Sequence, residues 1–301
     1  MKRLFRDQQG STLILFALAF IGMMAMAGLV LDGGMLYVEK AALQKTADAA
    51  VLSGAQELTD SQDEVQQVVN HILAAHGKSN TLVDLNVVMN DKVSVSLKET
   101  VPLSFFSIFG QDTGTVTAQS TAEIGPMGRA TGAAPLGIDA SVDLVYNKEY
   151  QLKVDQTLED TGNFGVLALG GEGASNYYDN LRNGYDGELK VGDIVQTETG
   201  NISGKTRQAV QELIEACPYP DGDYDHRDCP RVILIPVYEP YNDTQNQIKE
   251  VKITGFAYFY ISEPVDSQDK TVQGIFIKRT GKGYVNSEAL NRGAYAIRLT
   301  E

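Results

Sequence analysis

The chain has 301 residues, of which 43% are hydrophobic and 21% charged, and this composition excludes wholesale disorder and collagen-like repeats. Its 25 basic and 39 acidic residues give a net charge of −14, which argues against nucleic acid as a partner because such binding needs Lys and Arg to neutralise phosphates. Two cysteines and three histidines leave room for one disulfide but not for a four-cysteine zinc site.

The N-terminus predicts a membrane anchor. Lys2, Arg3 and Arg6 precede residues 11–31, STLILFALAFIGMMAMAGLVL, which contain no charged side chain. A helix of this length is about 31 Å long and matches a hydrocarbon core of roughly 30 Å. Because the basic residues precede the apolar segment, the positive-inside rule predicts a cytoplasmic leader over residues 1–10 and export of the rest. We therefore expect a single-pass protein of the cell membrane with an extracytoplasmic C-terminal domain.

Two processing alternatives stay open beside a retained membrane span. Ala25-Met26-Ala27 fits the small-x-small pattern that signal peptidase cleaves. Gly10 ends a short basic leader, as in prepilins, although Leu15 occupies the position where prepilins usually have Glu. The apolar stretch is longer than the apolar region of a usual signal peptide, and helical patterning continues past the signal-peptidase site, so retention is the favoured interpretation.

The helix is expected to continue through residues 33–58 as a stalk. Its apolar positions recur at three- and four-residue steps and comprise Leu36, Leu43, Ala47, Ala50, Val51, Gly54 and Leu58. The small residues Ala47, Ala50 and Gly54 would let another element approach closely. Two interpretations remain: a stalk packed on its own domain, or an assembly face between subunits that includes self-association.

These residues carry a family resemblance. The segment resembles the N-terminus of the TadE/TadG-like proteins of Flp (Tad) pilus assembly, in which an Asp-x-Gly step follows the membrane helix, as Asp32 and Gly34 do here. A later block of that family is matched by Leu43, Gln44, Ala47, Asp48, Ala49, Ala50, Leu52, Gly54 and Ala55. The missing Glu after the leader favours the TadG-like branch. The resemblance implies a structural role, with the membrane and other Flp/Tad assembly proteins as partners.

The remainder of this first region, residues 32–125, predicts a pilin-like arrangement of a long helix on a small antiparallel sheet. Asp60 or Ser61 can cap a second helix over residues 62–76. Strands are expected at residues 82–89, 92–101 and 114–124, with a tight turn at residues 90–91 between the first two. An apolar cluster, Phe105, Phe106, Ile108 and Phe109, is interpreted as core, with a membrane or partner patch as the alternative.

Residues 126–135 are small, turn-rich and without periodicity, so they predict a linker to a C-terminal domain over residues 136–301. That domain predicts helices at residues 174–182 and 206–216. Its expected strands are 142–146, 150–154, 166–169, 194–197, 231–237, 251–261, 272–278 and 294–299. The fold class is therefore α+β, with a β-rich C-terminal domain.

The chain lacks the common catalytic and cofactor motifs. It contains no Gly-x-Ser-x-Gly elbow, Walker loop or His-Glu-x-x-His sequence, and residues 170–173 and 200–206 lack the spacing of nucleotide-binding loops. Cys217 and His226 are a poor nucleophile and base pair because a second cysteine lies close by. We therefore expect no enzyme and no cofactor.

Residues 217–229 carry two further candidate features. Cys217 and Cys229 are expected to form a disulfide in an exported domain, with two separate buried thiols as the alternative. Asp221, Asp223 and Asp225 are weak calcium candidates, because the following positions depart from a calcium loop. The rival function is accordingly an exported, membrane-tethered hydrolase or calcium-dependent binding module in residues 136–301.

Overall fold

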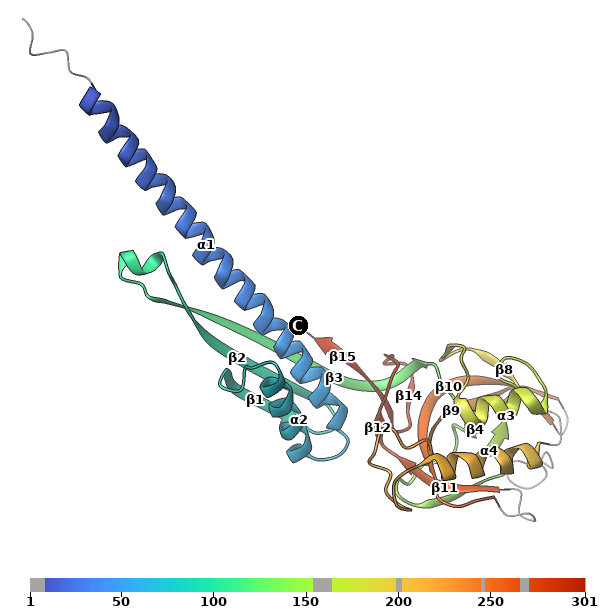
Figure 1. The fold of residues 1–301 in the computed structure, drawn as a ribbon. Coiled ribbons are helices and arrows are strands. Elements are labelled where there is room, and N and C mark those ends of the chain that lie inside the picture. Colours follow the sequence, from blue (N-terminus) through green and yellow to red (C-terminus); the bar gives the residue numbers. More distant parts are fainter. Residues whose placement is uncertain (1–8, 154–163, 199–201, 245–246, 266–270, 301) are drawn as a thin grey trace, which may run out of the picture.

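A long helix projects from a β-rich body that has two parts (Figure 1). The structure is a computed structural model that describes residues 9–153, 164–198, 202–244, 247–265 and 271–300. The projection is helix α1, Gln9–Gly54, and a short 3-10 helix, η1, Ala55–Glu57, follows it. The overall class is α+β, as predicted.

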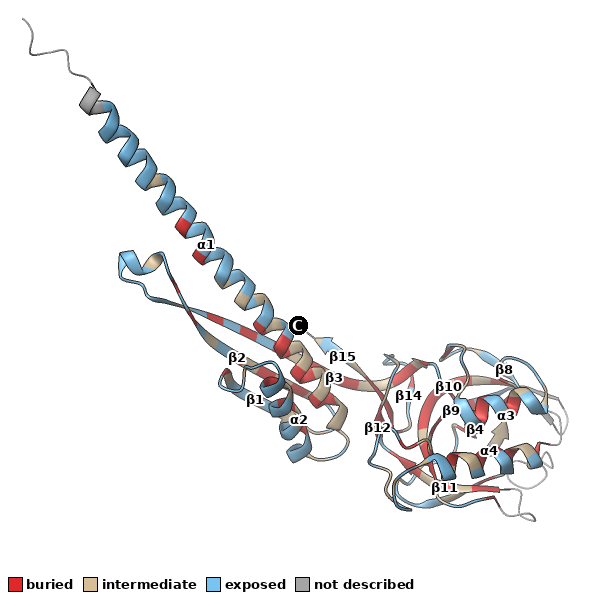
Figure 2. Cartoon of the chain, in the orientation of Figure 1, coloured by how far each residue is buried: buried red, intermediate tan, exposed pale blue. Residues whose placement is uncertain are grey.

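Helix α1 runs for 46 residues without a break, because no proline interrupts its sequence. The part of α1 before Gly28 lies free of the body and is largely exposed (Figure 2), and its exposed apolar residues include Leu18 and Phe20. Within the described residues, α1 is the helix that is long and apolar enough to cross a membrane. The predicted membrane segment and the predicted stalk are thus one continuous helix.

The C-terminal part of α1 packs on helix α2, Gln62–Ala75, and on strands β1, Leu82–Val88, β2, Lys92–Pro102, and β3, Thr113–Ala130. The Ser61 hydroxyl accepts the Glu64 N–H at 3.2 Å and caps α2. Asn90, with a φ of 60°, makes the turn that pairs Val88 with Lys92. The predicted second helix and first hairpin are therefore confirmed.

The small residues of α1 face the inside of this first part. Ala47, Ala50 and Gly54 are buried, and a Cβ built on Gly54 would lie 2.8 Å from Cγ2 of Val69. The surrounding core contains Leu43, Val51, Leu58, Val65, Leu73, Val93, Val95 and Leu97. Of the two interpretations of these positions, the structure favours packing within the chain over an exposed assembly face, since all three are buried and Gly54 lies against α2.

Strand β3 runs through the first half of the predicted linker, so the linker prediction over residues 126–135 is wrong up to Ala130. Residues 121–126 pair with strand β15, Ala294–Thr300, which comes from the other end of the chain. The first sheet has the order β1-β2-β3-β15-β12, and three short strands complete it: β7, Leu189–Lys190, β12, Arg279–Thr280, and β13, Tyr284–Val285. The two parts of the body therefore share a sheet.

The second sheet builds most of the C-terminal part, in the order β5-β11-β10-β9-β4-β6, with β8 and β14 on β10. Its strands are β4, Leu136–Asp139, β5, Glu149–Lys153, β6, Phe164–Val166, β8, Ile194–Gln196, β9, Val232–Thr244, β10, Gln247–Ile261, β11, Thr271–Ile277, and β14, Leu290–Asn291. Helices α3, Ala174–Asn183, and α4, Ser203–Ala216, contribute buried residues to the core of this sheet.

Residues 142–146 form no strand, although the sequence predicts one. Val142, Leu144 and Tyr146 alternate in sequence and pack, partly buried, against the second core. An irregular segment lying on a core thus produces the same period-2 pattern as a half-buried strand.

We expect Gly54→Leu to lower the free energy of unfolding of the detergent-solubilised protein by about 1–3 kcal/mol, because overpacking forces Val69 and its neighbours to move. Denaturant titration followed by circular dichroism measures the change. Gly33→Leu is the matched control on the same helix, since no atom lies within 4 Å of its Cβ position. Equal effects of the two substitutions would contradict the buried contact.

Candidate functional site at the membrane-proximal end

The end of the apolar segment of α1 holds the tip of the β2–β3 hairpin. Asp32 follows that segment directly and is only 2% exposed. Its Oδ1 accepts the N–H of Ser104 at 3.1 Å, and its Oδ2 accepts the N–H groups of Phe105 and Phe106 at 2.9 and 2.8 Å. A carboxylate on the helix therefore fixes three successive backbone donors of the tip.

Close backbone approach completes this contact. A Cβ built on Gly28, one turn before Asp32, would lie 2.6 Å from ring carbons of Phe105, so only glycine fits beneath that ring. The tip itself is the 3-10 helix η2, Phe106–Phe109, which Gly110 ends in a left-handed conformation with a φ of 84°. Gly28 and Asp32 together form the seat of the hairpin tip on α1.

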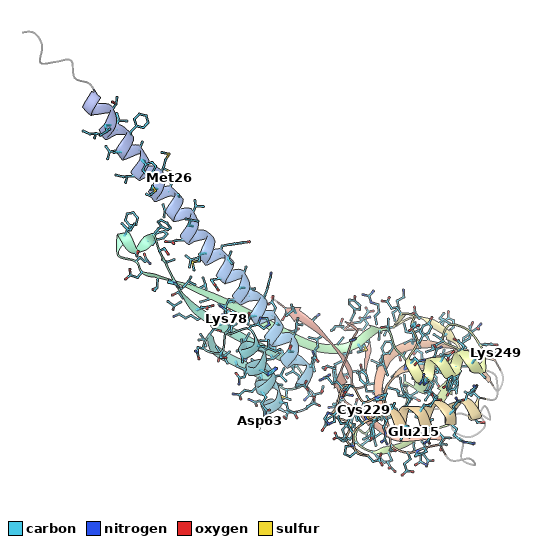
Figure 3. The ribbon with its side chains drawn as sticks, in the orientation of Figure 1. Met26, Asp63, Lys78, Glu215, Cys229 and Lys249 are labelled. Atoms are coloured by element: carbon cyan, nitrogen blue, oxygen red, sulfur yellow. A yellow bond between two sulfur atoms is a disulfide. The ribbon has the colours of Figure 1, made fainter. Side chains whose placement is uncertain are left out.

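The apolar cluster of the tip is not core. Ile108 and Phe109 are 79% and 71% exposed, and Phe105 is exposed apart from its contact with α1. The prediction of a core cluster is therefore wrong, because no other element covers the tip in the described part of the chain. Figure 3 shows the tip of the β2–β3 hairpin beside the part of α1 that carries Met26.

The short helix η1, which directly follows α1, contacts the C-terminal part of the chain through Arg227. Its guanidinium binds the Glu57 carboxylate at 3.3 and 3.2 Å, donates to the Gln56 carbonyl oxygen, and donates to the Thr280 carbonyl oxygen at 3.0 Å. The Thr280 hydroxyl also donates to the Gln56 carbonyl oxygen at 2.7 Å. These bonds join the end of the long helix to both the residue 217–229 loop and strand β12.

Cys217 and Cys229 form a disulfide in the structure, with Cα atoms 4.9 Å apart, in agreement with the predicted pairing. Helix α4 ends directly before the first cysteine, and strand β9 begins three residues after the second. The bridge therefore closes the loop that carries Arg227.

The carboxylates of this loop point to different partners. Asp221 pairs with the buried Arg231, Asp223 lies 3.2 Å from His226, and the Tyr219 hydroxyl donates to Asp228 at 2.8 Å. No three His, Cys, Asp or Glu side chains converge on a common point among the described residues. The predicted calcium site at Asp221, Asp223 and Asp225 is not formed in this arrangement.

The geometry does not assemble the nucleophile and base of the rival hydrolase. The Cys217 sulfur is bonded to Cys229, and His226 lies on the surface, stacked on Tyr219 at 3.6 Å between ring centroids. A cavity of about 540 Å³ does open between the two parts of the body, but neither Cys217 nor His226 lines it. Its charged lining residues are Arg182, Arg227, Arg279 and Lys282.

Comparison with known proteins bears on the N-terminal segment alone. A family model described as putative Flp pilus-assembly TadE/G-like matches residues 10–57, which confirms the resemblance predicted from the Asp-x-Gly motif and the alanine-rich block. No curated protein and no solved structure matches the chain. A TadE/G-like segment on a free apolar helix fits a membrane-anchored pilus-assembly component.

Sequence reasoning missed the seat at Gly28 and Asp32. Asp32 belongs to the Asp-x-Gly motif, and Gly28 lies in the uncharged segment, but the residues that contact them lie more than 70 positions away in the chain. The charge of Asp32 directly after an uncharged segment is the signal that pointed to it. The identity of its hydrogen-bond partners required the structure.

We expect the junction between the two parts of the body to be pH-dependent. Desolvation, together with the neighbouring Glu57 carboxylate, raises the pKa of Asp60 from 3.8 to about 7, against the opposing effect of Arg227. Because the folded state then binds the proton more tightly than the unfolded state, this group's contribution to stability falls as pH rises from about 4 to about 7.

Denaturant titrations across this range measure that contribution as the difference between the protein and its Asp60→Asn variant, whose amide resembles the protonated acid. The variant is expected to be the more stable of the two above pH 7, with the difference vanishing toward pH 4. Parallel stability curves for the two proteins would contradict the assignment.

Alkylation tests the disulfide. The non-reduced protein is expected to take up no iodoacetamide at Cys217 or Cys229, and to take it up at both after reduction. In the chain-entropy model, replacing both cysteines by serine costs roughly 3 kcal/mol of stability for a loop of this length. Alkylation of either cysteine without reduction would show that the bridge is absent.

Proposed function

We propose that the protein is a single-pass, outward-facing component of Flp/Tad pilus assembly that acts structurally and performs no catalysis. The observation that carries the proposal is that one element, α1, contains both the apolar span and the buried stalk. The TadE/G-like match covers this same element. A rigid helix of this kind fixes the position of the body relative to the bilayer.

The charge distribution supports the outward orientation. Lys2, Arg3 and Arg6 lie before the apolar segment, and the acidic surplus of the chain lies after it. A disulfide in the C-terminal part is consistent with an oxidising compartment outside the cytoplasm. Both observations favour export of residues 33–301.

Contacts with partner subunits are proposed to use the free part of α1. Its side chains between residues 12 and 31 are largely exposed, and Gly22 has no atom within 4 Å of its Cβ position. Small residues in a membrane helix allow a second helix to approach closely. Other Flp/Tad assembly proteins, or a second copy of this chain, are the partners that this surface suits.

Protease accessibility tests the topology. In intact protoplasts, added protease is expected to digest residues 33–301 and to spare a tag placed before residue 10. Leu18→Arg is expected to weaken insertion by about 2.5–3.5 kcal/mol on translocon scales. Leu299→Arg, at an exposed position of β15, is the matched control and is expected to insert normally.

Protection of the body together with digestion of the tag would show that the protein has the opposite orientation. A soluble product that begins after Ala27 would instead establish cleavage by signal peptidase and remove the anchor.

A further inference from the structure

The hairpin tip over residues 103–112 carries exposed apolar side chains directly beside the proposed membrane span. We propose that this tip inserts into the interfacial region of the same bilayer that α1 crosses, and so gives the protein a second contact with lipid. The inference rests on the proposed membrane anchoring of α1. It adds an interaction surface that neither the family match nor the span itself assigns.

The tip contacts α1 close to the end of its uncharged segment. Phe105 lies on Gly28, and Gly28 precedes Leu31, the last residue of the uncharged segment, by about 4.5 Å of helix rise. Interfacial side chains lie roughly 5–10 Å deep at the boundary between headgroups and acyl chains. The contact between tip and helix therefore lies at the depth of that boundary.

The exposed surface of the tip combines apolar side chains with polar neighbours. Ile108 and Phe109, the most exposed apolar residues of the tip, contact no other element of the described chain that would cover them. Ser104, Ser107 and Gln111 lie between and beside them and supply groups suited to the headgroup layer. An apolar end with a polar margin is the pattern of segments that rest in a membrane interface.

Backbone N–H groups of the tip are already hydrogen-bonded within the chain. An unpaired N–H group is costly once it leaves water, so irregular backbone enters a membrane only where its donors are paired. Asp32 accepts the donors of residues 104–106, and the N–H groups of Ile108, Gly110 and Gln111 donate to carbonyl oxygens within the tip at 3.0–3.2 Å. The Leu103 N–H also donates to the Asp112 carbonyl oxygen at 2.9 Å. These seven donors of the tip are therefore paired before it meets lipid.

The size of the patch favours lipid over a protein partner. A stable protein interface buries about 800 Å² on each side and engages roughly 20–30 residues. The tip offers Phe105, Ile108 and Phe109 as its large exposed apolar side chains. Lipid requires no complementary surface, and the adjacent span would bring it to the tip without a separate binding step.

The chain contains no tryptophan, so a single introduced tryptophan reports on one position. We would reconstitute Phe109→Trp in phosphatidylcholine–phosphatidylglycerol vesicles whose acyl chains carry bromine either near the glycerol backbone or near the chain ends. The expected result is strong fluorescence quenching by the shallow bromines and weaker quenching by the deep ones. Phe20→Trp, near the middle of the span, is expected to show the reverse order.

Tyr241→Trp, at an exposed position on β9 in the C-terminal part, is the control in water and is expected to show no quenching. Quenching of Trp at position 20 without quenching at position 109 would overturn the lipid contact while leaving the anchor intact. That outcome would point to a protein partner for the tip. Absence of quenching at position 20 would overturn the membrane anchoring and the inference together.

Asp32→Ala in the Phe109→Trp background tests the seat. Loss of the carboxylate is expected to abolish the preference for shallow bromines, whereas Asp84→Ala, at an exposed position on β1, is expected to preserve it. An unchanged quenching pattern in Asp32→Ala would overturn the role given to Asp32. Ile108→Ser leaves the seat intact and is expected to reduce quenching, and unchanged quenching there would count against the apolar contact.

Discussion

The contact of the β2–β3 hairpin with α1 on both sides of two adjacent glycines is the interaction that keeps the long helix straight. Gly33 and Gly34 have no neighbouring atoms at their Cβ positions, and glycine within a helix costs roughly 0.5–1 kcal/mol relative to alanine. The β2–β3 hairpin contacts the helix on both sides of this pair. Before it lies the seat formed by Gly28 and Asp32, and after it Leu36 packs against Gly114 on β3. The hairpin therefore acts as a splint across the segment of α1 that would bend most easily, and the body keeps a fixed direction relative to the span.

Strand β3 carries this rigidity into the rest of the chain. It begins at the hairpin tip, pairs with β2 over its first part, and pairs with β15 from the C-terminus before it ends at Ala130. Arg227 closes a second connection by binding Glu57 of η1, which directly follows α1. The C-terminal part is thus attached at several separate places rather than through one linker. A force applied to either part of the body would be transmitted to α1 through paired strands and charged hydrogen bonds.

Local signals in the sequence predicted the elements that local interactions determine. The cap at Ser61, the turn at Asn90 and the uncharged segment of α1 all act within a few residues, and the structure contains each of them. The errors concern partners that are distant in sequence. Residues 126–130 resemble a linker because nothing nearby indicates that the distant strands β7, β13 and β15 will pair with them. The small residues of the stalk were equally ambiguous, because close approach by α2 of the same chain and by another subunit require the same side chains. The disulfide was predictable because closing a short loop with proline and glycine constrains both cysteines.

The chemistry of Asp32 explains why a carboxylate, rather than another polar side chain, occupies the seat. Three backbone donors converge on it, and a carboxylate offers two oxygens with about four acceptor sites and no donor. Asparagine would present one acceptor oxygen, and its NH₂ group would face an N–H of the tip. Serine is too short to span from the helix to residues 104–106. Burial of the ionised group is tolerated because charged acceptors form hydrogen bonds roughly twice as strong as neutral ones. Asp32 of the Asp-x-Gly motif therefore acts here as the acceptor that attaches a hairpin to the apolar helix α1.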